Sequence, residues 1–331
     1  MNLKDIAEIA DVSIATVSRV LNNKSGVGKA KRKEIETLLI ESGFYNKTLK
    51  SPEDLKKIAV IVPDLKNPFF AEVVKYISEE MFNKDYQVMI FDTDENFDVE
   101  KKAIDAIVRS GISGVILCIC GGTKSEENIK TLSKYSIPFV LIDRELDFYH
   151  DGVFLDDFKA GFLATEALIK AGHSNIGILS GSLNHKNMKN RFLGYCHALE
   201  MYNLDSKKEF LYEGNLDLKS GYEVMKKISD KNSSMTAILS CNNLMTLGIL
   251  KYQNEVKNSK RISIIGFDNP DYFNILNLNI SCVTRSIADM GILSSKLLLK
   301  KLTSDVEHTQ KIIINPNLIL KGSEKYEKSD S

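Results

Sequence analysis

From Ile58 onward, the sequence alternates short apolar runs with amphipathic helical patterns, and few folds accommodate that alternation. The apolar runs are rich in β-branched residues, as expected for strands that are buried on both faces of a sheet. The helical patterns between them indicate parallel, doubly wound sheets. The runs are too many for one compact sheet, so the sequence predicts an α/β body of two similar Rossmann-like lobes. The expected strands are residues 58–62, 88–91, 115–118, 139–142, 176–179, 237–239 and 262–265, and the expected helices include residues 69–82, 99–109, 159–171, 187–201 and 287–301.

Residues 1–46 instead show the pattern of an all-α domain with three short helices. The first helix is expected over residues 2–10, the second over residues 14–21 with Ser13 as its N-cap, and the third over about residues 29–42. The first two helices and their short turn form a helix-turn-helix, the unit that places its second helix in the major groove of DNA. A three-helix cap with no role in DNA binding has the same periodicity. The inward-facing positions are Leu3, Ile6, Ala7, Ala10, Val17, Leu21, Ile35, Leu38 and Leu39.

The second of these helices carries side chains that suit contact with DNA. Ile14 and Ala15 suit apolar contact with a thymine methyl group, and Arg19 suits hydrogen bonding to guanine. Short polar side chains suit contact with phosphate oxygens. The candidates for phosphate contact are Ser13, Thr16, Ser18 and Asn22.

The stretch LKDIA from Leu3, followed by ADVSIATVSRVLN from Ala10, resembles the DNA-binding head of the lactose/galactose repressor family. The match is nearly continuous over about twenty residues, so it is highly specific. The resemblance implies a sequence-specific regulator of transcription, a repressor, that forms a homodimer on a pseudo-palindromic DNA operator, with each head reading one half-site. It also adds Leu3 and Lys4 to the candidate DNA contacts.

The segment after the head departs from that family. Residues 47–57 are polar and contain Pro52, as expected of a linker. Family members have a Pro-Asn … Ala-Arg-x-Leu segment here, which becomes a helix on DNA and inserts its Leu into the minor groove. This chain has GFYNKTLK from Gly43, which is shorter and lacks both the Pro and the Ala-Arg. Leu49 either inserts as the wedge, unstacking a base step at about a few kcal/mol, or packs against the linker.

The body, residues 58–321, resembles the ligand-binding domain of the same family and the related periplasmic sugar-binding proteins. We expect lobe one over about residues 58–157 plus 287–312, lobe two over about 158–284 plus the C-terminal segment, and a polar tail over 322–331. The motifs that carry the resemblance are Asn67-Pro68-Phe69-Phe70, Asp143-Arg144, Arg191-x-x-Gly194-Tyr195, the run CNNLMTLG from Cys241, and Gly266-Phe267-Asp268-Asn269.

Nearly all of these motifs follow the carboxyl end of an expected strand, where open α/β sheets bind ligands. Their chemistry suits a polyol. Asp143 and Asp268 can accept hydrogen bonds from hydroxyl groups, and Phe69 and Phe70 offer apolar faces to a sugar ring. The candidate donors to sugar oxygens are Asn67, Arg144, Arg191 and Asn242. We therefore expect a small effector, a sugar or a sugar derivative, between the two lobes.

Several of these residues also have an ordinary structural explanation. Phe69 and Phe70 can belong to the core, Asp143 and Arg144 can form a plain ion pair, and Asp268 can cap a turn. Arg191 can be a solvated residue at a helix start. The occurrence of all of them at equivalent loop positions favours a pocket.

Arg285 is a second departure, because sugar-binding relatives often carry Gln at the matching position. With Arg144 and Arg191 it gives the expected cleft three arginines. One interpretation is an anionic effector, such as a sugar phosphate or sugar acid. The other is that Arg285 pairs with Asp268 or with Asp289.

The charge, the cysteine content and the apolar runs limit the partners and the cellular location that the sequence predicts. The net charge is +0, so no global charge draws the chain to nucleic acid, although residues 1–50 carry nine basic and six acidic side chains. The five cysteines form no C-x-x-C pair and predict reduced thiols in a cytoplasmic protein. No signal peptide is expected, and no run approaches the ~20 apolar residues of a membrane span.

No catalytic or cofactor motif stands out. The histidines lack the spacing of a metal site, and there is no nucleophile elbow, phosphate loop or dinucleotide fingerprint. We therefore expect no enzyme, no metal and no cofactor. An alternative to the sugar effector is a DNA-binding regulator whose body responds mainly to a partner protein.

Overall fold

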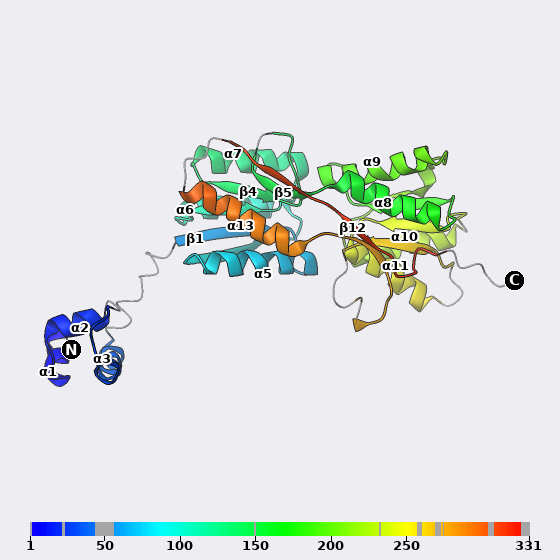
Figure 1. Ribbon diagram of the computed structural model, residues 1–331. Helices are drawn as coiled ribbons and strands as arrows, with labels where there is room; N and C mark the ends of the chain where they lie inside the picture. The colour runs from blue at the N-terminus through cyan, green and yellow to red at the C-terminus, as the bar shows by residue number, and fades with distance from the viewer. Residues whose placement is uncertain are drawn as a thin grey trace. The chain divides into compact units, whose positions relative to one another are not determined.

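The computed structural model describes residues 2–21, 24–43, 56–148, 150–231, 233–256, 260–268, 273, 275–303 and 308–325. The chain forms two compact units, which divide between Lys56 and Lys57 (Figure 1). We call them the head and the body. Asn22, Leu49 and Asn269 lie outside the described residues, so the expected DNA contacts of Asn22 and Leu49 stay predictions.

The head consists of the expected helices α1 (Leu3–Ile9), α2 (Ile14–Leu21) and α3 (Lys29–Glu41). The Asn2 side chain accepts hydrogen bonds from the backbone N–H groups of Lys4 and Asp5, and the Asp5 side chain accepts one from the Asn2 N–H at 2.6 Å, which completes a capping box. Ser13 caps α2 by accepting from the Thr16 N–H at 3.2 Å. The core of the head is formed by Ile6, Ala7, Ala10, Val17, Val20, Ile35 and Leu39.

The body contains two six-stranded sheets, one in each lobe, as the sequence predicts (Figure 1). In lobe one the strand order is β11-β5-β4-β3-β1-β2, and in lobe two it is β12-β10-β9-β8-β6-β7. The registered strand pairs of the described residues are parallel, except that β12 runs antiparallel to β10. The strands are β1 (Lys56–Val62), β2 (Tyr86–Asp92), β3 (Gly114–Leu117), β4 (Phe139–Ile142), β5 (Gly152–Leu155), β6 (Ile176–Ser180), β7 (Leu211–Glu213), β8 (Ala237–Ser240), β9 (Ser263–Phe267), β10 (Ser281–Thr284), β11 (Lys311–Ile314) and β12 (Asn317–Ile319).

Helices cover both faces of each sheet, because successive side chains of a strand point to opposite faces. In lobe one, Ile58 and Val60 pack against α5 (Pro68–Phe82) and α13 (Ile287–Thr303). On the other face, Ala59 and Ile61 pack against α6 (Phe97–Arg109) and α7 (Glu126–Lys134). Lobe two is covered in the same way by α8 (Asp157–Lys170) and α9 (Lys186–Met201) on one face, and by α10 (Leu218–Asp230) and α11 (Asn243–Glu255) on the other.

The chain passes between the lobes three times: after β5, after β10 and after β11. Consequently α8 follows a strand of lobe one but packs in lobe two, and α13 follows a strand of lobe two but packs in lobe one (Figure 1). Each lobe is thus completed by a helix that arrives from the other. A ligand between the lobes lies beside these connections.

Two sequence-based expectations need correction. The expected strand at residues 88–91 is not buried on both faces: β2 is the edge strand of lobe one, and Met89 and Ile90 are 39% and 46% exposed. Residues 322–325, which were expected to begin a polar tail, bond to lobe two. The Glu324 side chain is buried there and accepts from the Ser281 hydroxyl, and the Ser323 hydroxyl donates to the Ile264 carbonyl at 2.7 Å.

Glycines bring α8 and α9 into close contact. A Cβ added at Gly161 would clash with the backbone carbonyl of Arg191, and one added at Gly194 would clash with the carbonyl of Phe158. Gly221 and Gly248 play the same part between α10 and α11. The α8–α9 crossing places Arg191 beside the start of α8.

We expect Gly194→Ala to lower the free energy of unfolding of the body by about 1–3 kcal/mol, because a methyl group at this crossing forces the two helices apart. Urea denaturation followed by circular dichroism measures this. Gly28→Ala is the control, because a Cβ there meets nothing within 4 Å. Equal stability of Gly194→Ala and the wild-type protein would show that the crossing tolerates a methyl group.

Candidate functional site

A cavity of about 500 Å³ lies between the lobes, at the carboxyl ends of the strands of both sheets. It receives side chains from both lobes, as the expected positions of the motifs predict. Every candidate ligand residue named from the sequence lines this cavity: Asn67, Phe69, Phe70, Asp143, Arg144, Arg191, Asn242, Asp268 and Arg285. Leu216, Asn187 and Glu95 line it as well.

Asp143 and Asp268 occupy equivalent places in the two lobes. Asp143 directly follows β4 and Asp268 directly follows β9, and these strands hold the same position in their sheets. Both residues adopt left-handed backbone conformations, with φ of 61° and 59°, which Asp tolerates better than most residues. Both side chains are buried. Two carboxylates therefore approach the cleft from opposite lobes.

Arg285 lies between these two carboxylates. Its Nε and Nη2 donate to the two oxygens of Asp268 at 3.1 and 3.2 Å, and its Nη1 donates to Asp143. Its guanidinium carbon lies 3.5 Å from the centre of the Phe69 ring. Arg285 thus pairs with Asp268, as one of the two interpretations of the sequence held, and it also pairs with Asp143.

These charges influence one another. Burial disfavours the ionised form of Asp143, yet Arg285, Arg191 and Arg144 together hold its pKa below the usual value. Burial also disfavours the charged form of Arg285, but Asp268 and Asp143 raise its pKa. The lowered pKa of Asp143 and the raised pKa of Arg285 both favour the charged forms of this pair.

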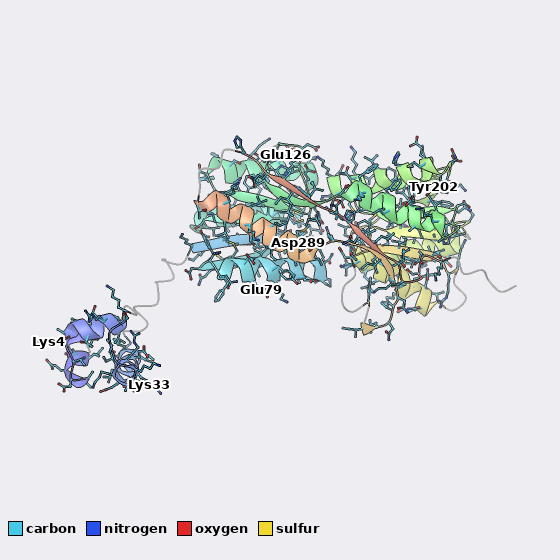
Figure 2. All side chains as sticks on the ribbon, in the orientation of Figure 1. Lys4, Lys33, Glu79, Glu126, Tyr202 and Asp289 are labelled. Atoms are coloured by element: carbon cyan, nitrogen blue, oxygen red, sulfur yellow. The ribbon has the colours of Figure 1, made fainter. Side chains whose placement is uncertain are left out.

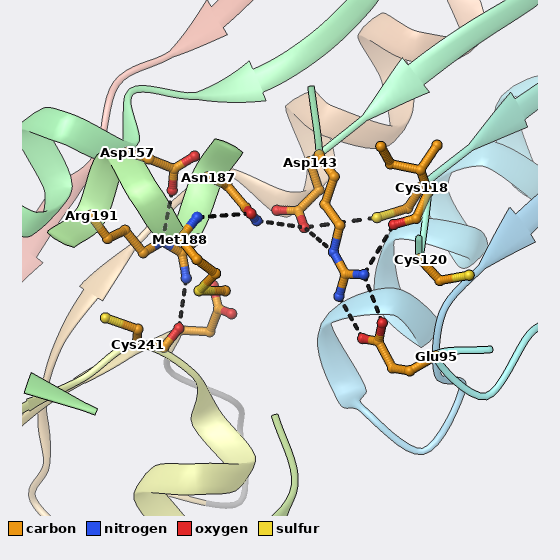
Figure 3. A network of polar contacts seen from close by, with 12 residues as sticks. Glu95, Cys118, Cys120, Asp143, Asp157, Asn187, Met188, Arg191 and Cys241 are labelled. Carbon is orange, nitrogen blue, oxygen red and sulfur yellow. Dashed lines mark hydrogen bonds and ion pairs between the residues drawn. The ribbon is translucent and has the colours of Figure 1, made fainter. Parts of the chain in front are cut away.

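Arg144 points toward the carboxylate of Glu95, which was not among the site residues expected from the sequence. Its Nη1 donates to Glu95 Oε2 at 2.7 Å and to the Ile119 carbonyl at 3.0 Å, and its Nη2 donates to the other oxygen of Glu95 (Figure 3). Its Nε is 4.0 Å from Asp143, beyond hydrogen-bond distance. Arg144 is thus held mainly by Glu95 rather than by its neighbour in sequence. Glu95 follows β2 in a loop that carries no motif.

Arg191 is buried and is not a solvated residue at a helix start. Its Nε donates to Asp157 at 2.7 Å and its Nη1 to the Cys241 carbonyl at 2.6 Å, while its plane lies 3.9 Å from the centre of the Phe267 ring (Figure 3). Its Nη2 has no hydrogen-bond partner among the described residues. This atom is a donor that a ligand in the cavity could satisfy.

The two asparagines act first as helix caps. Asn67 accepts from the Phe69 N–H at 3.1 Å at the start of α5, and Asn242 accepts from the Met245 N–H at 3.0 Å at the start of α11. Asn67 also accepts from Asn243 Nδ2 at 2.9 Å, across the cleft. Their carbonyl oxygens are therefore already engaged within the protein.

Phe69 and Phe70 serve the core as well as the cavity. Both are almost fully buried in the hydrophobic core of lobe one, and their rings meet edge to face at 4.8 Å. The core explanation offered for Phe70 is therefore correct, although the ring still borders the cavity.

Asn187 links the lobes at a second point. Its Nδ2 lies 3.5 Å from Asp143 Oδ2, and the same carboxylate oxygen lies 3.8 Å from the Cys118 sulfur (Figure 3). The sequence did not identify Asn187, Asn243 or Asp157 as part of the site. Asp157 follows β5, a strand that the apolar pattern did not reveal.

The second candidate site is the outer surface of α2 in the head. Ile14, Ala15 and Arg19 are exposed there, whereas Val17 and Val20 are buried on the inner face. The Ser13 hydroxyl group forms a hydrogen bond with the Thr16 hydroxyl and accepts one from the Thr16 N–H. It therefore caps the helix, in addition to any contact with phosphate. Ser18 is half-buried on the same helix.

Two further candidates lie on α1. Leu3 is half-buried against the core of the head, so packing accounts for part of its role. Lys4 on α1 and Lys33 on α3 are exposed at the surface (Figure 2).

The described residues contain no group of His, Cys, Asp and Glu side chains that could hold a metal ion. In the same part of the chain, each helix is too short or too polar to cross a bilayer.

Comparison with known proteins decides the family. The sequence profile of the periplasmic binding proteins and sugar binding domain of the LacI family matches residues 55–322. The profile of bacterial regulatory proteins of the lacI family matches residues 2–46. The chain belongs to the LacI family of bacterial regulatory proteins. It is therefore a DNA-binding transcriptional regulator with an effector-binding body, and not an enzyme.

Relatives of this LacI-family chain match it over nearly its full length. The HTH-type transcriptional repressor PurR of Pasteurella multocida is 28% identical over 98% of both chains. The lac repressor dimer bound to operator and the anti-inducer ONPF has a TM-score of 0.79 at 19% identity, covering 98% of this chain and 99% of its own. A LacI family regulator from Enterococcus faecium with bound ribose has a TM-score of 0.73 at 24% identity, covering 82% and 100%. These two structures share the fold.

Asp157 makes the stability of this LacI-family body depend on pH. Burial raises its pKa to about 6, although Arg191 opposes the shift. Because the folded state favours protonated Asp157, this group contributes stability at pH values below its ordinary pKa of 3.8. That contribution is lost as the pH rises through about 6. We expect the free energy of unfolding of the wild-type protein, relative to Asp157→Asn, to fall by roughly 2–3 kcal/mol between pH 4 and pH 7.

Urea denaturation of both proteins at several pH values measures this difference, in which the titration of all other groups cancels. A difference that stays constant from pH 4 to pH 7 would show that Asp157 titrates at its ordinary pKa.

Proposed function

We propose that this LacI-family regulator is a homodimeric repressor whose operator affinity is controlled by a neutral carbohydrate bound in the cleft between the lobes. The observation that carries the proposal is the pairing of the cleft arginines. Arg144 is paired with Glu95, Arg191 with Asp157, and Arg285 with Asp143 and Asp268. No arginine of the cleft is left to neutralise an anion, which argues against the sugar phosphate or sugar acid considered from the sequence.

The charge of the cavity wall supports the same choice. Six carboxylates line it, Asp64, Asp94, Glu95, Asp143, Asp217 and Asp268, against the four cations Lys66, Arg144, Arg191 and Arg285. An anionic effector would meet a net negative wall. Hydroxyl groups instead donate to carboxylates, and the spare Nη2 of Arg191 can donate to a sugar oxygen. A cavity of about 500 Å³ is within the usual range for small-molecule sites.

The comparison with the ribose-bound Enterococcus faecium regulator supports the ligand class, because that protein has the same body fold. Effector binding then acts by changing how far the two lobes are closed. In a dimer, a change in closure moves the two linkers and with them the spacing of the heads. The heads must lie roughly one helical turn of DNA, ~34 Å, apart to read both half-sites of a pseudo-palindromic operator.

Exposed apolar side chains support self-association. Met89 and Ile90 on the edge strand β2 are partly exposed, and Phe82 at the end of α5 is 79% exposed. Exposed large apolar side chains of this kind are available to a protein interface. The lac repressor neighbour is a dimer. The proposed operator complex contains two copies of the chain, related by the two-fold symmetry of the DNA site.

Calorimetric titration with matched sugars tests the effector class. We expect ribose or glucose to bind more tightly than ribose 5-phosphate or glucose 6-phosphate, because each phosphate brings negative charge to a negative wall. The full-length protein is titrated at constant ionic strength. Tighter binding of the phosphorylated member of either pair would contradict the neutral effector, and binding of none of them would favour a body that responds to a partner protein.

Arg19 tests the role of the head. We expect Arg19→Ala to weaken operator binding by about 1–3 kcal/mol and to relax the preference at one base pair, because a side chain in the major groove contributes base-specific contacts. The operator is first obtained by selecting bound genomic fragments in vitro. Arg109→Ala, which removes an exposed arginine of the body, is the matched control. Equal losses in the two variants would assign Arg19 a general electrostatic role.

A further inference from the structure

Arg285 occupies the place that the sequence assigns to the effector. The sugar-binding features expected at this point are the face of Phe69 and the carboxylates of Asp143 and Asp268. In the structure, the Arg285 guanidinium stacks on that ring and bonds to both carboxylates. A polyol ring that used the same three groups would therefore compete with Arg285. The remaining cavity lies beside this side chain.

The same contacts bridge the two lobes. Arg285 follows β10 and Asp268 follows β9, both in lobe two, whereas Asp143 follows β4 and Phe69 begins α5, both in lobe one. The bidentate pairing with Asp268 orients the guanidinium within lobe two. Its Nη1 and its flat face are then presented to lobe one.

Burial makes this bridge different from the other ion pairs between the lobes. The side chains of Arg285 and Asp143 are 4% and 6% exposed. Separating the lobes would break this desolvated, hydrogen-bonded pair of charges, which attract more strongly than charges in water do. Among the described residues, the other ion pairs across the lobes join Lys186 to Glu145 and Asp147 and are partly exposed. Exposed pairs contribute little to stability.

We propose that Arg285 is an intramolecular occupant of the cleft. It holds the two lobes together when no effector is bound, and the effector displaces it from Asp143 and from the face of Phe69. The displacement rests on the proposed carbohydrate site, whereas the bridging of the lobes does not. An effector that lacks donors for Asp143 leaves Arg285 in place, so the exchange selects ligands with several hydroxyl groups. Because the occupied state must open first, the effector binds with a lower apparent affinity than an open cleft would give.

The lobe-closing part is tested in full-length protein without effector, by the distance between spin labels on opposite sides of the cleft mouth. Lys66→Cys and Lys219→Cys carry the labels, because both lysines are exposed. Cys196→Ser removes the half-exposed native thiol. Samples with a single label reveal any distance that arises between subunits.

Asp143→Asn is the test variant, and we expect it to shift the label distances to longer values, because it removes the carboxylate that receives Arg285 in lobe one. Arg285→Lys is a second variant that keeps the positive charge, but a single ammonium cannot reproduce the planar bidentate pairing and the bridge together. It should shift the distances in the same direction. Asp157→Asn is the matched control: it removes a buried carboxylate bonded to a buried arginine within lobe two alone.

Unchanged distances in both Asp143→Asn and Arg285→Lys would overturn the proposal. So would an equal lengthening in Asp157→Asn, because the opening would then follow from general loss of stability. To test the displacement, the calorimetric titration with neutral sugars is repeated with Arg285→Lys. This variant should bind the sugars several-fold more tightly than the wild-type protein does. Equal or weaker binding overturns the displacement. If no neutral sugar binds either protein, the carbohydrate proposal fails while the label distances still decide the bridge.

Discussion

Two buried aspartates at the carboxyl ends of equivalent strands, one from each lobe, require a positive charge between them, and Arg285 supplies it. Ionised carboxylates are tolerated in a protein interior only when they are paired and hydrogen-bonded. The side chain that meets this requirement spans the cleft. The ion pairs that balance the charges of the site therefore also hold the two lobes together. The composition of the cavity wall and the preference for a neutral effector both follow from the same pairing.

The crossed connections of the body place the other functional groups. Because α8 arrives from lobe one, Asp157 at its start lies beside Arg191 on α9, and the close contact at Gly161 and Gly194 maintains that proximity. Arg191 is thereby held by Asp157 and by the Cys241 carbonyl, with one donor left over. A change in the relative position of the lobes also acts on the three connections between them, which include the residues next to Arg285.

Much of the site could be predicted from the sequence, and the exceptions have physical reasons. Motifs that resemble the family identified Asp143, Asp268 and Arg191, and the carboxyl ends of parallel strands bring such residues to one edge. Glu95 and Asn187 were missed, since Glu95 lies in a loop without a motif and Asn187 lies one turn before the motif on α9. The short strands β5, β7, β10, β11 and β12 were also missed. They have three or four residues each, and β7, β11 and β12 are only partly buried, so their apolar pattern is weak.

The sequence by itself determined the family through its motifs, and it determined the helix-turn-helix head and the two-lobed α/β body because hydrophobic periodicity and helix caps are local properties of the chain. It also named nine of the side chains that line the cleft. Only the tertiary structure decided how those side chains are paired. Arg144 bonds to Glu95, 49 positions away, and Arg285 to Asp143, 142 positions away. The pairing of these side chains depends on which strand ends and loops the fold brings together. That information is absent from any local stretch of sequence.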